Sequence, residues 1–378
     1  MSRFSVAKQV ALDNLETLIV ELLGGNASPR HRQRSGWNVV WPYRARAKAS
    51  QTIIWLNGAR RGGWRDFVSG EGGDVIDLVA AVKSGSVTQQ SRLDAVEWLE
   101  DRFGLRRLDP ATRERMEREA KARREAIEAA EEKRRAGARD RARRFFYSCL
   151  PIEGSLAETY LAKARGIELA GVPNLAPALR FHPACEYWLA APRDATGRKT
   201  ASGPMLPAMI AAMVDERGRL SACHYTFLRP DGLDKSELAV PAGEDLPKAK
   251  MMFPETYGLR IRLTYGPSGL NMERAAAEGV SGLEGVAEGI EDALSAGLAY
   301  PGLRAAAAGS LSGFLSLYDH DAVSGWLLFK DNDWDNPQAG ATFERAVARQ
   351  RRFGKPVEVV QMPGSWGKDV NDALRGTP

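Results

Sequence analysis

In the last quarter of the chain, short apolar runs alternate with longer segments whose apolar residues recur at helical spacing. The runs have the length of strands, and the segments between them have the length of helices. We predict strands at 285–287, 303–309, 325–329 and 356–361, and helices at 290–299, 311–318 and 340–352. One run, Trp326 to Phe329, is apolar at every position, which is typical of a strand buried on both faces. Alternating strands and helices predict a parallel sheet flanked by helices.

The N-terminal part of the chain carries shorter and more varied patterns. We predict helices at 4–23 and 91–105 and short strands at 37–41 and 51–56. After the second strand, a glycine-rich turn leads to Asp74, whose carboxylate can cap a helix that begins at Val75. Residues 1–105 are therefore predicted to form a small domain that combines a β-ribbon with helices.

A charged stretch separates this domain from the rest of the chain. Residues 106–145 are rich in Arg, Lys, Glu and Ala, which favours a helix, yet they have almost no apolar stripe to bury. We interpret them as an exposed helical spacer. The next region, 146–275, mixes strands and helices and includes a predicted β-hairpin that turns at 215–218. The chain is thus predicted to be α/β plus α+β, with its parallel sheet in 276–378.

Acidic residues follow two of the predicted parallel strands. Glu288 ends one strand, and Asp331 and Asp333 come directly after another. Ligands of open α/β sheets bind outside the carboxyl ends of the strands, so these acids stand where a site is expected. Alternation along an extended chain would point Asp331 and Asp333 the same way, and a hard cation such as Mg²⁺ would relieve their repulsion. The alternative is a solvated acidic loop or a helix N-terminus.

Taken together, these residues resemble a known domain. The set consists of Glu288 in a G-x-x-E-G setting, Gly309-Ser310, Asp331-x-Asp333, and GKDVND at 367–372. In this order it resembles the Toprim domain that bacterial primases, type IA and type II topoisomerases and some nucleases share. The resemblance implies that Glu288 is the general acid/base or a metal-linked glutamate, and that Asp331 and Asp333 bind metal. Further members of a site for two Mg²⁺ or Mn²⁺ ions would be Asp369 and Asp372, followed by Asp335, Glu291 and Asp292.

The glycine turn before Asp74 carries a second resemblance. The segment 70–79, GEGGDVIDLV, resembles the end of the zinc-binding domain of bacterial primases, where a β-ribbon runs into a Gly-Gly-Asp turn and an apolar helix. That family holds its ribbon with cysteines and a histidine, but Cys149, Cys185 and Cys223 all lie elsewhere in this chain, with no close pair. We therefore expect a version without zinc, whose core is built from tryptophans.

Basic residues are interleaved with aromatic ones in the N-terminal domain. Arg60, Arg61, Trp64 and Arg65 suit single-stranded nucleic acid, because aromatic faces stack on bases and cations contact phosphates. The alternative is that the tryptophans form the core of the small sheet, since such sheets need large side chains.

Lysines recur over a short stretch of the middle region, at Lys235, Lys248 and Lys250. The region around them resembles the part that precedes Toprim in primase-like proteins of phages and mobile elements. In those proteins this part helps to hold template and nucleotide, which implies that the lysines contact phosphates. Exposed lysines of a surface loop are the alternative.

Bulk composition narrows the function classes. The chain has 378 residues, enough for more than one domain, and its formal net charge of +5 favours a polyanionic partner. It has no apolar run of membrane-spanning length and no signal-peptide core, so we expect a soluble cytoplasmic protein without a membrane partner. The pattern G-x-x-x-x-G-K-[ST] is absent, so a replicative helicase would be a separate protein.

The sequence favours a DNA primase or primase-like nucleotidyltransferase of a phage, plasmid or mobile element. It would join nucleoside triphosphates into short primers on single-stranded DNA by a two-metal mechanism. One alternative is a Toprim nuclease that uses the same acids to activate water. Another is a DNA-binding replication accessory protein without catalytic activity. The primase-like Gly-Gly-Asp segment favours synthesis over cleavage.

Overall fold

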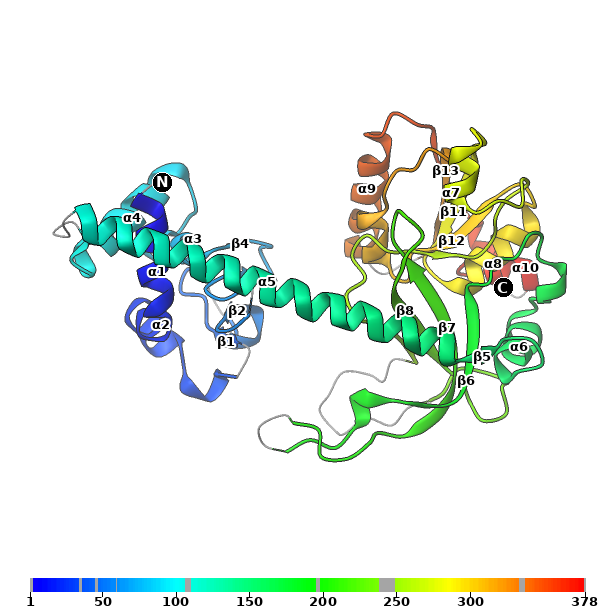
Figure 1. Cartoon of the computed structure of the whole chain (residues 1–378), viewed down its shortest axis with the longest axis horizontal. Coiled ribbons are helices and arrows are strands. Elements are labelled where there is room, and N and C mark those ends of the chain that lie inside the picture. The colour runs from blue at the N-terminus through cyan, green and yellow to red at the C-terminus, as the bar shows by residue number, and fades with distance from the viewer. Residues whose placement is uncertain are drawn as a thin grey trace. The chain divides into compact units, whose positions relative to one another are not determined.

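A computed structural model describes residues 3–33, 36–44, 47–58, 60–105, 110–194, 198–237, 249–332 and 337–376. Their contacts divide the chain into two compact units, Met1–Arg134 and Arg135–Pro378. Figure 1 shows the helices and strands of each unit, and helix α5 (Pro110–Ser148) begins in the first and ends in the second. None of the helices in the described ranges has the length and apolar character needed to span a lipid bilayer.

The first unit combines a small antiparallel sheet with helices. Its strands pair in the order β1 (Gly36–Val39), β2 (Thr52–Trp55), β3 (Trp64–Asp66), β4 (Gly72–Gly73), and its helices before α5 are α1 (Arg3–Asp13), α2 (Leu15–Leu23), α3 (Val75–Ser84) and α4 (Gln89–Arg102). The predicted cap of α3 is confirmed, because the Asp74 carboxylate accepts hydrogen bonds from the N–H groups of Ile76 and Asp77. The single helix expected over 4–23 is wrong, since Asn14 adopts φ −110° and ψ 22° and separates α1 from α2.

The tryptophans of the small sheet lie mostly in the core of the first unit. Trp37, Trp41 and Trp64 are 4%, 7% and 1% exposed. The rings of Trp41 and Trp64 stack with their centroids 4.6 Å apart. This corrects the expectation that Trp64 stacks on a base, because a ring that is buried against another tryptophan has no free face. The alternative, that the tryptophans form the core of the small sheet, is correct for these three residues.

The second unit begins with an antiparallel sheet. Its strands pair in the order β5 (Leu150–Pro151), β6 (Leu179–Glu186), β7 (Met205–Val214), β8 (Leu220–Phe227), β9 (Lys250–Phe253), and α6 (Leu156–Thr159) with a π-helical turn (Tyr160–Ala164) lies between β5 and β6 in sequence. The predicted hairpin is confirmed as β7 and β8. The end of α5 is not an exposed spacer, because Ala138, Ala142 and Phe146 are buried four residues apart and the last two share a core with β7 and β8.

The C-terminal part of the second unit contains a mostly parallel sheet. Its strands pair in the order β10 (Ile261–Arg262), β12 (Arg304–Ala307), β11 (Gly282–Ala287), β13 (Val323–Lys330), β14 (Val357–Gln361), and its helices are α7 (Met272–Ala277), α8 (Ile290–Ala299), α9 (Pro337–Arg351) and α10 (Val370–Arg375). The pairs from β12 to β14 are parallel, as predicted from the alternation of strands and helices, and β10 is an antiparallel edge. The segment expected as a helix at 311–318 is a short 3₁₀-helix, Leu311–Ser316.

Strand β13 is buried on both faces, as its apolar run predicted. Trp326 and Leu328 pack in one core with α9, and Phe329 packs in another core with α8. The core around Phe329 also includes Met209 of β7, so the two sheets of the second unit share it. The predicted boundary at residue 275 therefore runs through a continuous core.

Candidate active site

Glu288 lies half-buried between the end of β11 and the start of α8. Its backbone carbonyl accepts a hydrogen bond of 3.0 Å from the N–H of Gly309, in the turn after β12. The ends of the two strands therefore meet at one edge of the sheet. Gly289, between Glu288 and α8, lies close to the carboxylate of Asp292, because a Cβ atom there would be 2.8 Å from Oδ2 of Asp292 and would force that side chain to shift.

At the end of β13, Asn332 joins the strand to the loop before α10. Asn332 is 4% exposed, its N–H donates to the carbonyl of Lys368 (2.8 Å), and its side-chain amide donates to the carbonyl of Gly367 (3.0 Å). Asp331, the residue directly before it, is half-buried. These bonds hold the start of α10 beside the end of β13 and bring Asp369 to the same edge of the sheet as Asp331.

Three carboxylates gather at this edge. Asp292, in the first turn of α8, is 7% exposed, and its Oδ1 accepts a hydrogen bond of 3.1 Å from the N–H of Asn371. Burial raises the pKa of Asp292 well above its usual range, and the carboxylates of Asp369 and Asp331 raise that pKa further. Carboxylates affect each other in this way only when they lie close together in a poorly solvated place. Asp331 and Asp369, predicted from different segments, are thus neighbours.

Asp372 and the acids that follow Asn332 are the remaining predicted metal ligands. Asp369 caps α10, since its Oδ1 accepts from the N–H of Asp372 (2.9 Å). Asp372 lies in the first turn of α10, and its Oδ2 accepts from the N–H of Lys368 (3.0 Å). Asp333 and Asp335 lie outside the described residues. In the part of the chain that the structure describes, no three His, Cys, Asp or Glu side chains are arranged to hold a metal ion.

The buried carboxylate of Glu291 pairs with two lysines close to Asp292. Its Oε2 lies 2.8 Å from Nζ of Lys250, and its Oε1 lies 3.7 Å from Nζ of Lys235 and accepts a hydrogen bond of 2.7 Å from the hydroxyl of Tyr160. Burial would raise the pKa of Glu291, but Lys250 and then Lys235 outweigh burial and hold that pKa well below its usual range. Both lysines are therefore part of a charged network and not of a free surface loop. Lys248 lies outside the described residues.

Sequence reasoning missed two members of this network. Nε of Arg165 donates to the hydroxyl of Tyr160 (2.9 Å), and the Arg165 carbonyl accepts from the side chain of Asn371 (2.8 Å). Both residues lie in the segment 160–167, YLAKARGI, but no local pattern indicates that their side chains join this network. Asp292, ranked low from sequence, had a usable signal, because it lies in the first turn of the helix predicted at 290–299, directly after Glu288 and Gly289.

The predicted cations of the N-terminal domain lie on the surface of the first unit. Arg60, Arg61 and Arg65 are exposed. The guanidinium of Arg60 lies 5.2 Å from the centroid of the ring of Trp55, a half-buried aromatic side chain. These residues are therefore available for an anionic ligand, unlike Trp64.

The buried carboxyl of Asp292 predicts a pH dependence of stability. Because its folded pKa is raised, folding binds a proton, so the free energy of unfolding should fall as pH rises from about 4, the pKa of an unfolded aspartate, toward the folded pKa. Asp292→Asn should remove this decline and raise stability at neutral pH by about 1 kcal/mol or more, since one pKa unit corresponds to about 1.4 kcal/mol. Urea unfolding in EDTA from pH 4 to 8 would measure it. Asp321→Asn, which changes an exposed carboxylate, should leave the decline in place; parallel curves for all three proteins would contradict the close approach of the acids.

Comparison with known proteins gives one family and several solved structures. The family described as Domain of unknown function (DUF7146) matches residues 136–263, and none of the curated proteins matches the chain. The chain is similar to the Aquifex aeolicus primase (zinc-binding and RNA polymerase domains), with 14% identity, a TM-score of 0.35, and coverage of 99% of this chain and 82% of that one. It is also similar to a DNA primase domain from Pseudomonas aeruginosa (19% identity, TM-score 0.33, 57% and 63% coverage) and to a DnaG primase catalytic domain bound to single-stranded DNA (17% identity, TM-score 0.35, 58% and 69% coverage). At such identities and TM-scores, the function of this chain has to be inferred from its own residues.

Proposed function

We propose that the chain is a primase-like nucleotidyltransferase that joins nucleoside triphosphates on a single-stranded DNA template, with residues 276–378 acting as a Toprim domain. The observation that carries the proposal is that a cluster of carboxylates adjoins a cluster of cations. A Cβ atom at Gly289 would lie 2.8 Å from Oδ2 of Asp292 and 3.6 Å from Nζ of Lys250. Such a pair of clusters suits a nucleoside triphosphate with its divalent cation, because the ion needs anionic oxygen ligands and the phosphates need cations.

The chemistry of the donors fits Mg²⁺ or Mn²⁺. Asp331 and Asp369 offer carboxylate oxygens, the ligands that hard cations prefer, and a cation there would relieve the repulsion that raises the pKa of Asp292. Glu288, at the adjacent strand end, would be a third ligand, and Asp333, from outside the described residues, a fourth. When bound, the ions would stabilise charge on the reacting phosphate and lower the pKa of the attacking hydroxyl.

The lysines would bind the triphosphate. Burial would lower the pKa of Lys250, but Glu291 outweighs burial and raises that pKa above its usual value, so the ammonium stays charged. Glu291 thereby keeps this cation beside the carboxylates before substrate arrives. Glu288 would accept the proton of the 3′-hydroxyl or hold a metal ion. The 3′-oxygen would then attack the α-phosphorus in line, and pyrophosphate would leave.

A Toprim nuclease would use the same acids, but the lysines favour synthesis. Water attack on a phosphodiester needs the carboxylates and their metal, whereas an incoming triphosphate brings additional negative charge that Lys250 and Lys235 can balance. These lysines are the specific observation that supports nucleotide transfer over cleavage.

The experiment that tests the proposal is primer synthesis by the full chain. The protein is incubated with mixed-sequence single-stranded DNA and labelled ribo- or deoxynucleoside triphosphates in Mg²⁺, Mn²⁺ or EDTA. We expect short labelled products that require both template and metal. Metal-dependent shortening of the template, without labelled products, would replace the proposal with a nuclease. DNA binding without either reaction would leave an accessory protein.

A further inference from the structure

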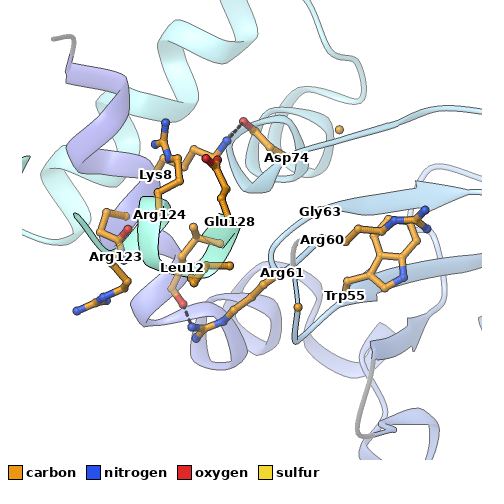
Figure 2. Close-up of a pocket in the computed structure, with 14 residues that line it drawn as sticks. Lys8, Leu12, Trp55, Arg60, Arg61, Gly63, Asp74, Arg123, Arg124 and Glu128 are labelled. Atoms are coloured by element: carbon orange, nitrogen blue, oxygen red, sulfur yellow. Dashed lines mark hydrogen bonds and ion pairs between the residues drawn. The ribbon is translucent and has the colours of Figure 1, made fainter. Parts of the chain in front are cut away.

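A cavity of about 530 Å³ lies within the first unit, and none of the residues that line it belongs to the candidate active site. Its walls come from α1, from the loop that follows β2, from the start of α3 and from the segment Arg123 to Glu128 of α5 (Figure 2). Its volume is within the range of about 300–1,000 Å³ that is typical of small-molecule sites. Helix α5 therefore does more than connect the two units, because it forms one wall of a cavity.

Cations dominate the lining of this cavity. The charged residues that line it are Lys8, Arg60, Arg61, Arg123 and Arg124 on the positive side and Asp74 and Glu128 on the negative side. Some of this charge is already paired: Nζ of Lys8 lies 2.7 Å from Oδ2 of Asp74, and Arg123 binds Asp13. Arg60 and Arg124, which lie on different walls, have no carboxylate partner among the described residues. Two guanidinium groups thus remain for an anion.

The cavity also offers flat and apolar surface. Trp55 lines it, with the guanidinium of Arg60 5.2 Å from the centroid of its ring (Figure 2). Ile127 of α5 also lines the cavity and is 44% exposed although it lies on a highly charged helix. Gly63 also lines the cavity and has no room for a side chain, because a Cβ atom there would lie 2.9 Å from the carbonyl oxygen of Arg60. An aromatic ring that carries a guanidinium group over it, with apolar surface in the same cavity, is suited to a planar group that carries a phosphate.

We propose that this cavity is a second nucleotide-binding site, in which Arg60 and Arg124 bind phosphate and the base packs against Trp55 and Ile127. The site goes beyond the proposed reaction, because it uses no carboxylate of the second unit and needs no metal. A free nucleotide and one residue of a single DNA strand share the chemistry that the cavity recognises. In either case, the ligand would link α5 to the loop between β2 and β3.

The first test locates the ligand on the full chain by photocrosslinking in EDTA. Azido-ATP and a single-stranded oligonucleotide that contains iododeoxyuridine are used separately, and the crosslinked peptides are identified by mass spectrometry. Crosslinks to peptides from 55–63 or 123–128 with either probe support the site, and the probe that gives them identifies a free nucleotide or a strand as the ligand. Crosslinks with both probes confined to the second unit would overturn the proposal.

The second test compares two double variants with the same change of charge. Arg60→Ala/Arg124→Ala removes the two unpaired guanidinium groups, whereas Arg30→Ala/Arg118→Ala removes two exposed arginines that do not line the cavity. In the strand case, we expect the first pair to weaken binding of a labelled oligothymidylate about 10-fold or more and to lower the salt slope by about 1.4, at about 0.7 per phosphate contact. In the nucleotide case, the same loss should appear in crosslinking by azido-ATP. Equal losses in both double variants would show diffuse attraction only and overturn the site.

A third variant tests the base contact, and its result is independent of the carboxylate chemistry. Trp55→Leu should weaken binding about 5- to 10-fold, because base stacking on an aromatic ring contributes about 1–3 kcal/mol, whereas Trp55→Phe should retain most of it. All measurements are repeated with Asp331→Asn, which should not change them. If these losses of binding appear but primer synthesis is absent, the binding site in the first unit is supported and only the proposed nucleotidyl transfer is refuted.

Discussion

Replacing Asp331 with asparagine is expected to lower the rate of primer synthesis about 10³-fold while the chain stays folded. The amide keeps the shape of the side chain but removes the negative charge that would bind the metal ion at the end of β13. Losing such a ligand costs several kcal/mol of transition-state stabilisation, and about 4 kcal/mol corresponds to 10³-fold. Initial rates at saturating nucleotide and template would measure the loss. Thermal unfolding should show no decrease in stability, because the change removes repulsion from Asp292.

The matched control is Asp321, a carboxylate that lies just before the other end of β13. Asp321 is exposed and lies two residues before Val323, the first residue of β13, so it marks the opposite edge of the parallel sheet. Asp321→Asn removes one carboxylate, as Asp331→Asn does, and should leave the rate within about 2-fold of wild type. Ligands of such sheets bind at the carboxyl edge. Equal rates for both variants would show that the carboxyl edge of this sheet does not carry the chemistry.

Replacing Glu291 with glutamine is expected to destabilise the second unit by about 3 kcal/mol. Breaking a buried ion pair from one side typically costs about 3–5 kcal/mol, because the remaining charge loses its partner. The lower value is expected here because the side chain of Lys250 is 33% exposed and keeps some contact with water. Urea unfolding monitored by circular dichroism at neutral pH would give the difference from wild type.

Two controls separate the destabilisation by Glu291→Gln from a general loss of charge: unfolding at low pH and a variant of an exposed ion pair. The folded pKa of Glu291 is lowered, so its stabilising contribution is complete above the unfolded pKa of about 4.3 and is lost as pH falls toward the folded pKa. The difference between wild type and Glu291→Gln should therefore shrink below about pH 4. Glu278→Gln breaks an exposed pair with Arg274 and should cost less than about 0.5 kcal/mol. A cost for Glu291→Gln as small as that would refute the buried network.

The sequence by itself determined the order of the elements and the location of two acids. Apolar runs of strand length and helical spacing predicted the parallel sheet, and they placed Glu288 and Asp331 at strand ends. The cap at Asp74 and the β7–β8 hairpin were also predicted correctly from the sequence. These features depend on residues a few positions apart, so periodicity and capping patterns are enough to predict them. The buried end of α5 had such a signal as well, in apolar residues at 138, 142 and 146.

The tertiary structure alone decided which distant groups meet. Asp369 approaches Asp331 because Asn332 joins β13 to the loop before α10. Glu291 meets Lys250 from 41 residues away and Tyr160 from 131 residues away. Sequence period indicates which face a side chain takes, but it does not indicate what packs against that face. The buried position of Trp64 and the cavity beside Trp55 follow from that packing, so they became visible only when the elements were assembled.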